Sequence, residues 1–295
     1  MAVPSFPEPS IARHEEGFLK SRDHLRLFWQ RYTPPAPRAT VAVLHGYGDH
    51  CGRYAGLTRA LCAAGLEAAL VDFRGHGQSD GRRAHVDAFG DYLDDLDAFL
   101  TRVRALADGR PLFVAAHSQG ALVATLWAVA RGRGGEGLRG FVLSSPYFRL
   151  ALTPPFYKVA AARLLDGVLP WLPMQTGLRM ADLTSDPEMQ AWTAHDRLYG
   201  RVATPRWFGE FQKAQAEVLR RAGEFRAPLL VLAAGADVIA DPRVAEEFVA
   251  RAGSVDKAFL RLEGKMHEIW NETDRDRSIA RAVEWIGAHL PAGEA

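Results

Sequence analysis

Apolar runs of strand length alternate with helical patterns along most of this chain. The first two runs, EEGFLKS (15–21) and HLRLFWQRY (24–32), are separated by a polar turn and predict a hairpin at a sheet edge. Later runs are continuously apolar, as in strands that are buried on both faces. They are TVAVLHG (40–46), EAALVDF (67–73), PLFVAAHS (111–118), RGFVLSS (139–145), APLLVLAAG (227–235) and DKAFLRLEG (256–264). This order predicts an α/β fold, with a mostly parallel sheet and helices on both faces.

Residues 146–203 interrupt the alternation. This segment is rich in proline and large apolar residues, and its pattern is not that of a buried strand. We therefore expect residues 1–145 and 204–295 to form the core domain and residues 146–203 to form an inserted helical cap. A helix is predicted to return the chain to the sheet from Thr204, a favoured N-cap residue, with Pro205 at the first helical position.

Within the expected cap, residues 156–172 have the spacing of an amphipathic helix. Apolar residues recur every three or four positions, while Lys158 and Asp166 fall on the other side. Such a stripe often packs on a core, but it also fits the wall of an acyl pocket or a face that touches lipid. The residues that we assign to substrate binding, including aromatic ones nearby, are Phe156, Val159, Leu164, Trp171, Trp192 and Trp207.

Composition narrows the class of protein. A chain of 295 residues with 48% hydrophobic side chains can bury one full-sized core. Its formal charge of +1 provides no basic field for nucleic acid, and Cys51 and Cys62 are not in a metal or redox spacing. The N-terminus does not read as a secretion signal and no stretch is long enough to span a membrane. We expect a cytoplasmic protein, with no protein partner implied and peripheral membrane contact through the cap left open.

Ser118 lies where a buried strand passes directly into a helical pattern, in the sequence AHSQGA (116–121). This is the context of a nucleophile elbow, where the serine occupies a strained turn and its neighbours must be small. Ala116 replaces the usual glycine and adds only one methyl group. A serine that merely caps the following helix would give the same local pattern, so the motif alone leaves both interpretations open.

The residues available to act with Ser118 decide between a nucleophile and a helix cap. A nucleophilic serine hydroxyl needs an imidazole as base, and the imidazole needs a carboxylate that orients it. His267 follows the final strand and fits best, whereas His117 is expected to point away from the serine. Asp237 follows a buried strand at the same sheet edge, while Asp241 precedes a proline and suits a helix N-cap. The order serine, acid, histidine favours Ser118, Asp237 and His267 as a catalytic triad.

A tetrahedral intermediate also needs backbone donors for its oxygen. We assign these to the N–H groups of Gln119, directly after the serine, and of Tyr47, in the glycine-rich loop HGYGDH (45–50). Asp72 also ends a strand, but it precedes the serine in the chain. We expect it to support the loop around residues 75–77.

Five motifs together resemble a known family. They are HGYGDH (45–50), DFRGHGQSDG (72–81), AHSQGA (116–121), GADVIADP (235–242) and KMHEIWNE (265–272). In this order they look like the monoacylglycerol lipase and lysophospholipase branch of the α/β-hydrolases. The resemblance implies an eight-stranded fold, a mobile cap over an acyl pocket, and Ser118, Asp237 and His267 as the triad. The sequence departs from the family at Ala116, at Asp49 where glutamate is frequent, and in the cap.

These observations predict a serine hydrolase that cleaves carboxylic esters of single-chain lipids through an acyl-enzyme, without a metal or organic cofactor. The alternatives are a carboxylesterase or thioesterase of smaller substrates, a peptidase of similar fold, and a hydrolase-like binding protein that has lost catalysis. The substrate in every case is a small molecule.

Overall fold

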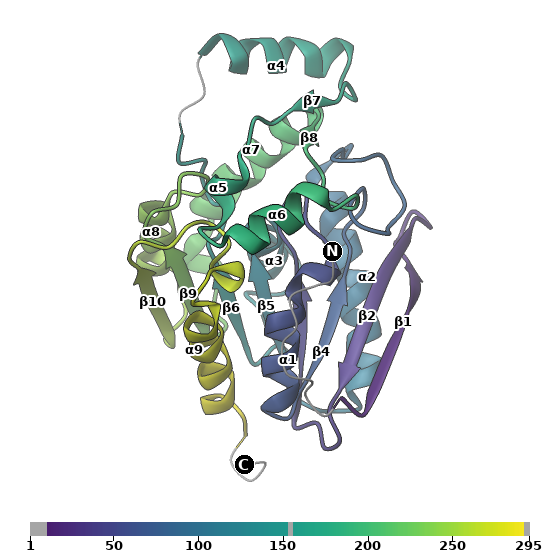
Figure 1. The fold of residues 1–295 in the computed structure, drawn as a ribbon, viewed down its shortest axis with the longest axis vertical. Coiled ribbons are helices and arrows are strands. Elements are labelled where there is room, and N and C mark those ends of the chain that lie inside the picture. The colour runs from purple at the N-terminus through teal and green to yellow at the C-terminus, as the bar shows by residue number, and fades with distance from the viewer. Residues whose placement is uncertain (1–10, 153–155, 292–295) are drawn as a thin grey trace.

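In the computed structural model of the protein, which describes residues 11–152 and 156–291, an eight-stranded sheet forms the centre (Figure 1). The strands are β1 (Arg13–Lys20), β2 (Arg26–Thr33), β3 (Ala39–Leu44), β4 (Leu66–Val71), β5 (Leu112–His117), β6 (Gly140–Ser144), β9 (Leu229–Ala234) and β10 (Lys257–Leu262). Their order across the sheet is β1-β2-β4-β3-β5-β6-β9-β10. β1 and β2 form an antiparallel hairpin at one edge, β2 is antiparallel to β4, and the other pairs are parallel. All the predicted strands are confirmed.

Helices cover both faces of the sheet, because side chains of a strand alternate between its faces. Ala42 and Leu44 of β3 lie in the larger apolar cluster, while Val41 and Val43 lie in the smaller one on the other face. The larger cluster is covered by α2 (Phe89–Ala107), α3 (Gln119–Ala130), α7 (Pro205–Arg220) and α8 (Pro242–Arg251). The smaller one is covered by α1 (Ala55–Ala63) and α9 (Arg275–Ala288). Three short 3-10 helices complete the core: η1 (Cys51–Tyr54), η2 (Ala222–Glu224) and η3 (Ile269–Asn271).

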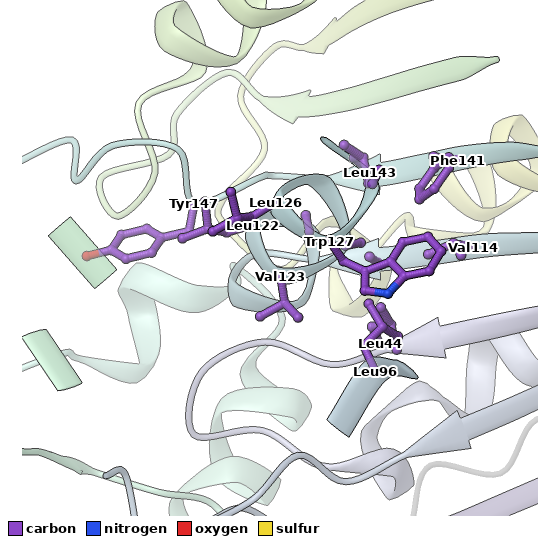
Figure 2. Packing of buried hydrophobic residues seen from close by; sticks show 14 of the residues in the cluster. Leu44, Leu96, Val114, Leu122, Val123, Leu126, Trp127, Phe141, Leu143 and Tyr147 are labelled. Atoms are coloured by element: carbon purple, nitrogen blue, oxygen red, sulfur yellow. The ribbon is translucent and has the colours of Figure 1, made fainter. Parts of the chain in front are cut away.

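Helix α3 is the most deeply buried of these helices, with every residue from Gln119 to Val129 buried. Figure 2 shows its Trp127 toward Val114 of the sheet and its Leu122 and Leu126 toward Tyr147, all within the larger apolar cluster. A helix that is apolar all round has to lie inside the protein rather than on its surface. The residue just before α3, Ser118, is therefore carried into the interior of the molecule.

The described residues of the segment 146–203, which are 146–152 and 156–203, gather at one end of the molecule, at the top of Figure 1. They form α4 (Phe156–Val168), α5 (Met180–Leu183), α6 (Pro187–His195) and an antiparallel ribbon of β7 (Met174–Gln175) and β8 (Val202–Ala203). The amphipathic helix predicted over residues 156–172 is present as α4, but it ends at Val168. The ribbon was not predicted, because strands of two residues leave no periodic pattern.

Thr204 is the N-cap of α7, as predicted, and its side chain accepts a hydrogen bond from Trp207 N. Polar contacts at both ends of α6 hold this helix on the core. His50 Nε2 lies 2.8 Å from Asp196 Oδ2, and Arg275 donates to Asp186 at 2.8 Å. Helix α4 instead lies against α7, where Arg206 pairs with Asp166.

Two further expectations concern cysteine and membrane insertion. Cys51 and Cys62 are both free and buried. Among the helices in the described part of the chain, none is long and apolar enough to cross a lipid bilayer.

The stability of the core can be tested at Phe141 of β6, which is fully buried and packs edge-on against Phe225 at 5.1 Å between ring centroids. Phe141→Ala is expected to lower the free energy of unfolding by about 3–5 kcal/mol, because it removes apolar contact and leaves a cavity. Phe18→Ala on β1 is the matched control, since that ring is 49% exposed. Urea unfolding followed by circular dichroism measures both. Equal losses at the two positions would contradict this packing.

Candidate active site

Ser118 sits in a sharp turn between β5 and α3. Its φ of 50° and ψ of −112° place a residue with a side chain in the left-handed half of backbone space, which is strained. The Ser118 N–H donates to the carbonyl of Ser144 at 2.9 Å, and its own carbonyl accepts from Tyr147 N at 3.1 Å. These bonds to the end of β6 fix the turn, so the hydroxyl group is presented at the carboxyl end of the sheet.

Two glycines let neighbouring backbone approach this turn. A Cβ atom at Gly120 would lie 2.6 Å from the carbonyl oxygen of His45, and one at Gly46 would lie 3.3 Å from Ser118 Cβ. The first distance is too short for any side chain, so α3 can start this close to the chain after β3 only with glycine at position 120. We call residues 45–50 the β3 loop.

His267 and Asp237 complete a continuous chain of contacts from the serine. His267 Nε2 lies 2.8 Å from Ser118 Oγ, and His267 Nδ1 lies 2.7 Å from Asp237 Oδ2. Asp237 Oδ1 in turn accepts hydrogen bonds from the backbone of Ile239 and Ala240 at 2.8 and 2.9 Å. The structure therefore brings together the three residues that the sequence assigns to a triad, although they are separated by up to 149 positions.

The surroundings of His267 favour its charged form. Burial lowers the pKa of the imidazole, but the Asp237 carboxylate outweighs burial by charge and by hydrogen bonding, with Glu268 and Asp49 acting in the same direction. The pKa of His267 consequently lies above its ordinary value of 6.5. An imidazole of this kind is a stronger base toward the serine hydroxyl.

The two competing aspartates have other roles in the fold. Asp241 caps α8, with its side chain accepting from Arg243 N at 3.0 Å and a proline following at the first helical position. Asp72 accepts from Gln78 N at 2.8 Å and from Cys51 N at 2.7 Å, so it holds the loop of residues 72–81 against the start of η1. Both assignments made from the sequence are confirmed.

His117 does not point away from the site, and the expectation that it would is wrong. Its ring centroid lies 4.8 Å from that of His267, and it lines the same cavity as Ser118. Side chains alternate between faces only while the backbone stays extended, and the positive φ at Ser118 ends that alternation. Burial lowers the pKa of His117 to about 3, so this second imidazole stays neutral.

The two expected oxyanion donors lie beside the serine. Gln119 is the first residue of α3, where the backbone N–H has no acceptor inside the helix. Tyr47 lies in the β3 loop and lines the cavity at Ser118, while its hydroxyl donates to the carbonyl of Val202.

A cavity of about 200 Å³, partly open to solvent, begins at Ser118 and His267. Its walls come from the core and from residues 146–203, and most of the lining side chains are apolar. The apolar and aromatic ones are Tyr47, Tyr147, Leu150, Leu178, Leu183, Tyr199, Ala203, Trp207, Phe208 and Ile239. Such a cavity suits an apolar chain that enters next to the serine.

Of the six residues assigned to substrate binding, only Trp207 lines this cavity. Phe156 and Leu164 lie on α4 and are 85% and 71% exposed, Trp171 just after it is 47% exposed, and Val159 is partly buried on the same helix. Trp192 packs against the Arg53 guanidinium, 5.0 Å from the ring centroid. The assignment to substrate binding is wrong for the residues of α4, because helical spacing reveals an apolar face but not what covers it.

The sequence reasoning missed several residues of the site. Tyr147 and Leu150 lie three and six residues after the end of β6, and their place shortly after a buried strand is a signal that could identify them. Asp49 and Glu268 also line the cavity, and both occur in motifs that carry the family resemblance. Across residues 11–152 and 156–291, His, Cys, Asp and Glu side chains form no group of three that could hold a metal ion.

The fold and this site define a serine hydrolase of the α/β-hydrolase class. The chain belongs to the family described as serine aminopeptidase S33, whose model matches residues 35–274. The predicted α/β-hydrolase fold is therefore confirmed.

Individual relatives agree with the resemblance to monoacylglycerol lipases and lysophospholipases. Human monoglyceride lipase is 31% identical over 272 residues, which cover 89% of this chain and 86% of that protein. A Bacillus subtilis protein named Phospholipase YtpA is 29% identical over 241 residues, 81% of this chain and 92% of its own length. The crystal structure of Paleococcus ferrophilus monoacylglycerol lipase matches with a TM-score of 0.80 and 26% identity, covering 89% of this chain and 99% of that one.

The position of His267 predicts the pH dependence of activity. A base must be neutral to accept the serine proton, so activity is lost as the pH falls through the pKa of His267. Because that pKa is raised, the acid limb of kcat/KM for a p-nitrophenyl ester is expected to have its midpoint above pH 6.5. A midpoint below that value would contradict the charge balance described for His267.

Two variants serve as controls for this profile. Asp237→Asn should lower kcat by about 10⁴-fold, because the imidazole loses the partner that orients it, and should move the acid limb to lower pH. Asp241→Ala should leave kcat near wild type and lower the free energy of unfolding by about 1 kcal/mol through loss of the cap. The reverse result would exchange the roles of the two aspartates.

Proposed function

We propose that this protein hydrolyses carboxylic esters of single-chain lipids, of the monoacylglycerol or lysophospholipid type, with Ser118, His267 and Asp237 as its catalytic triad. The observation that carries the proposal is the unbroken contact chain from Asp237 through His267 to Ser118, which ends in an apolar cavity. The names of the relatives, monoglyceride lipase and phospholipase, support the same class of substrate.

In the first half of the reaction, Ser118 Oγ attacks the ester carbonyl carbon while its proton passes to His267 Nε2. Asp237 stabilises the imidazolium that forms. The carbonyl oxygen becomes an oxyanion and accepts hydrogen bonds from the N–H groups of Tyr47 and Gln119, each worth about 3 kcal/mol in the transition state. Collapse of this intermediate breaks the ester C–O bond, and His267 gives its proton to the departing alcohol.

In the second half, water attacks the acyl group on Ser118. His267 takes one proton from that water, a second tetrahedral intermediate forms in the same pocket, and its collapse releases the fatty acid. The proton then returns from His267 to Ser118 Oγ. The full cycle consumes one ester and one water molecule and needs no further reactant.

Residues 146–203 act in this proposal as a cap over the acyl chain. The support is that this segment contributes Leu178, Leu183 and Tyr199 to the cavity walls, whereas the triad comes from the core. In this proposal the core carries out the chemistry, and residues 146–203 select the acyl chain.

A peptidase is the second candidate, because the family description names an aminopeptidase. Such an enzyme has to bind a substrate ammonium group, which calls for a carboxylate that is not already neutralised. Asp49 and Glu268 line the cavity, but both are paired with Arg53, at 2.7 and 2.6 Å. The charge balance therefore favours a neutral ester over a peptide N-terminus.

A fluorophosphonate probe and an acyl series test the proposal. The probe should label the native protein and fail to label Ser118→Ala, while Ser254→Ala, far from the site along the chain, should label as wild type. For p-nitrophenyl esters, kcat/KM should rise by up to about fourfold per added CH₂ until the cavity is filled, from about 0.8 kcal/mol per buried CH₂.

The possible failures are distinct. Labelling that persists in Ser118→Ala would point to another nucleophile, and absence of labelling in wild type would leave a binding protein. A flat or falling acyl series would favour a carboxylesterase or thioesterase of smaller substrates.

We also propose that α4 rests on lipid surfaces while substrate enters. Phe156, Leu164 and Val168 of this helix are at least 65% exposed, and Trp171 follows at its end. Exposed apolar side chains on one amphipathic helix gain free energy when they enter the interface of a bilayer.

Vesicle binding tests this second proposal. The double variant Phe156→Ser with Leu164→Ser should cosediment several-fold less with phosphatidylcholine vesicles, because each substitution removes a large apolar side chain from the interface. Its hydrolysis of dissolved p-nitrophenyl acetate should not change. Phe18→Ser, on the edge strand β1, is the matched control and should bind vesicles as wild type. Unchanged binding of the double variant would refute the role of α4.

A further inference from the structure

Arg53 is a fully buried cation at the junction of three segments. It belongs to η1, and its side chain has no exposed area. Its Nη2 donates to Glu268 Oε2 at 2.6 Å, its Nη1 donates to Thr193 Oγ1 at 2.6 Å, and its Nε lies 2.7 Å from Asp49 Oδ1. The rings of Trp192 and Tyr199 stack on it, with centroids 5.0 and 5.1 Å from the guanidinium carbon.

Each partner of Arg53 belongs to a part of the site. Asp49 lies in the β3 loop, two residues after Tyr47. Glu268 follows His267 directly in what we call the β10 loop, residues 263–272. Thr193 lies on α6 of the inserted segment. The Arg53 guanidinium thus contacts three parts of the site. These are the β3 loop, which carries the expected oxyanion donor, the β10 loop, which carries His267, and α6, which belongs to the segment that walls the cavity.

The two carboxylates are buried as deeply as the arginine. Asp49 is 2% exposed and Glu268 is 4% exposed. Tyr54 donates its hydroxyl to Asp49 at 2.7 Å, and Asn271 donates its amide to Glu268 at 2.9 Å, but neither of these groups carries a positive charge. Removing a buried cation from such a cluster leaves carboxylates without compensation, which is far more costly than losing a surface ion pair.

The charged and titratable groups that face His267 come from several elements. Asp237 follows β9, Glu268 is its neighbour in the β10 loop, Asp49 lies in the β3 loop, and the neutral His117 ends β5. Glu268 and Asp49 both favour the imidazolium form. Arg53 is the cation that contacts both carboxylates, and these carboxylates in turn hold the pKa of Arg53 above its ordinary value despite burial.

We infer that Arg53 is a positioning residue of the hydrolase site, which balances the charge of Asp49 and Glu268 beside His267 and joins the β3 loop, the β10 loop and α6. This inference rests on the proposed roles of Ser118 and His267. Arg53 touches no substrate atom in this scheme; it acts through the two carboxylates.

The inference makes opposite predictions for the two members of one ion pair. Arg53→Met leaves two carboxylates facing His267, so the imidazole holds its proton to higher pH. Glu268→Gln removes one of these carboxylates and leaves Arg53 in place, so the imidazole loses its proton at lower pH. Loss of packing alone would move both variants in the same direction or leave the midpoint unchanged.

The experiment measures the rate of fluorophosphonate labelling as a function of pH, because this reaction reports acylation of Ser118 and needs no lipid substrate. Arg53→Met should raise the acid midpoint by about one pH unit and slow labelling about tenfold below it. Glu268→Gln should lower the midpoint. The double variant should return it toward wild type, and Arg53→Lys should restore most of the wild-type profile.

Arg31→Met is the matched control for loss of a buried arginine. Arg31 has a side chain that is 9% exposed and pairs with Glu15 and Glu67 at the hairpin edge of the sheet. Its loss should lower the melting temperature and leave the midpoint in place.

Several outcomes would overturn the inference. They are shifts of Arg53→Met and Glu268→Gln in the same direction, no shift in either, or an equal shift in Arg31→Met. If Arg53→Met does not fold, Glu268→Gln still decides the matter through the direction of its midpoint, and Arg53→Lys does so by keeping a midpoint close to that of the wild type. Failure of the proposed function would be recognised separately, because the wild-type protein would then show no labelling that depends on Ser118.

Discussion

The strained turn at Ser118 is the constraint on which the rest of the site depends. With φ of 50°, the backbone reverses so sharply between β5 and α3 that the hydroxyl group leaves the sheet at its carboxyl end. Strain of this kind persists only where surrounding contacts hold it. Here those contacts are the bonds to the end of β6, the burial of α3 on all sides, and the close approach permitted by Gly120.

The same turn determines where the other groups must come from. Parallel strands all end at one edge, so the loops after β3, β9 and β10 meet at the serine. Asp237 reaches that edge from β9 and His267 from β10. Between β6 and α7, Leu150, Leu178 and Tyr199 also reach this edge, where they line the cavity.

Whether a feature of the fold or the site could be predicted depends on how far apart in the sequence the interacting residues are. A strand such as TVAVLHG is buried on both faces and is recognisable from its own residues, as is a proline-led helix capped by Thr204. The partnership of Ser118 with His267 could be predicted because the elements on which they lie follow each other in a fixed order. These parts of the fold needed no knowledge of distant contacts.

Other features depended on contacts that no local pattern records. The apolar stripe of Phe156 and Leu164 was read correctly as a helix, yet its spacing could not say that the stripe faces outward. His117 was misplaced because alternation was extended across a turn that ends it. The role of Arg53 has no signal in the sequence, since a lone arginine is usually solvated and only the tertiary structure shows its two buried carboxylates.

The contact between Gly48 and Gly200 has a consequence for how substrate preference can diversify. Gly200 N donates to Gly48 O at 2.6 Å, and a Cβ atom at Gly48 would lie 2.4 Å from the Gly200 carbonyl oxygen. The backbone beside Tyr47 is therefore in direct contact with the backbone at Gly200, which lies just before β8. An exchange of residues 146–203 between related proteins would replace one half of this contact, so this part of the chain cannot be exchanged independently of the β3 loop. A change in residues 146–203 that alters the shape of the cavity also alters the position of the β3 loop beside Ser118.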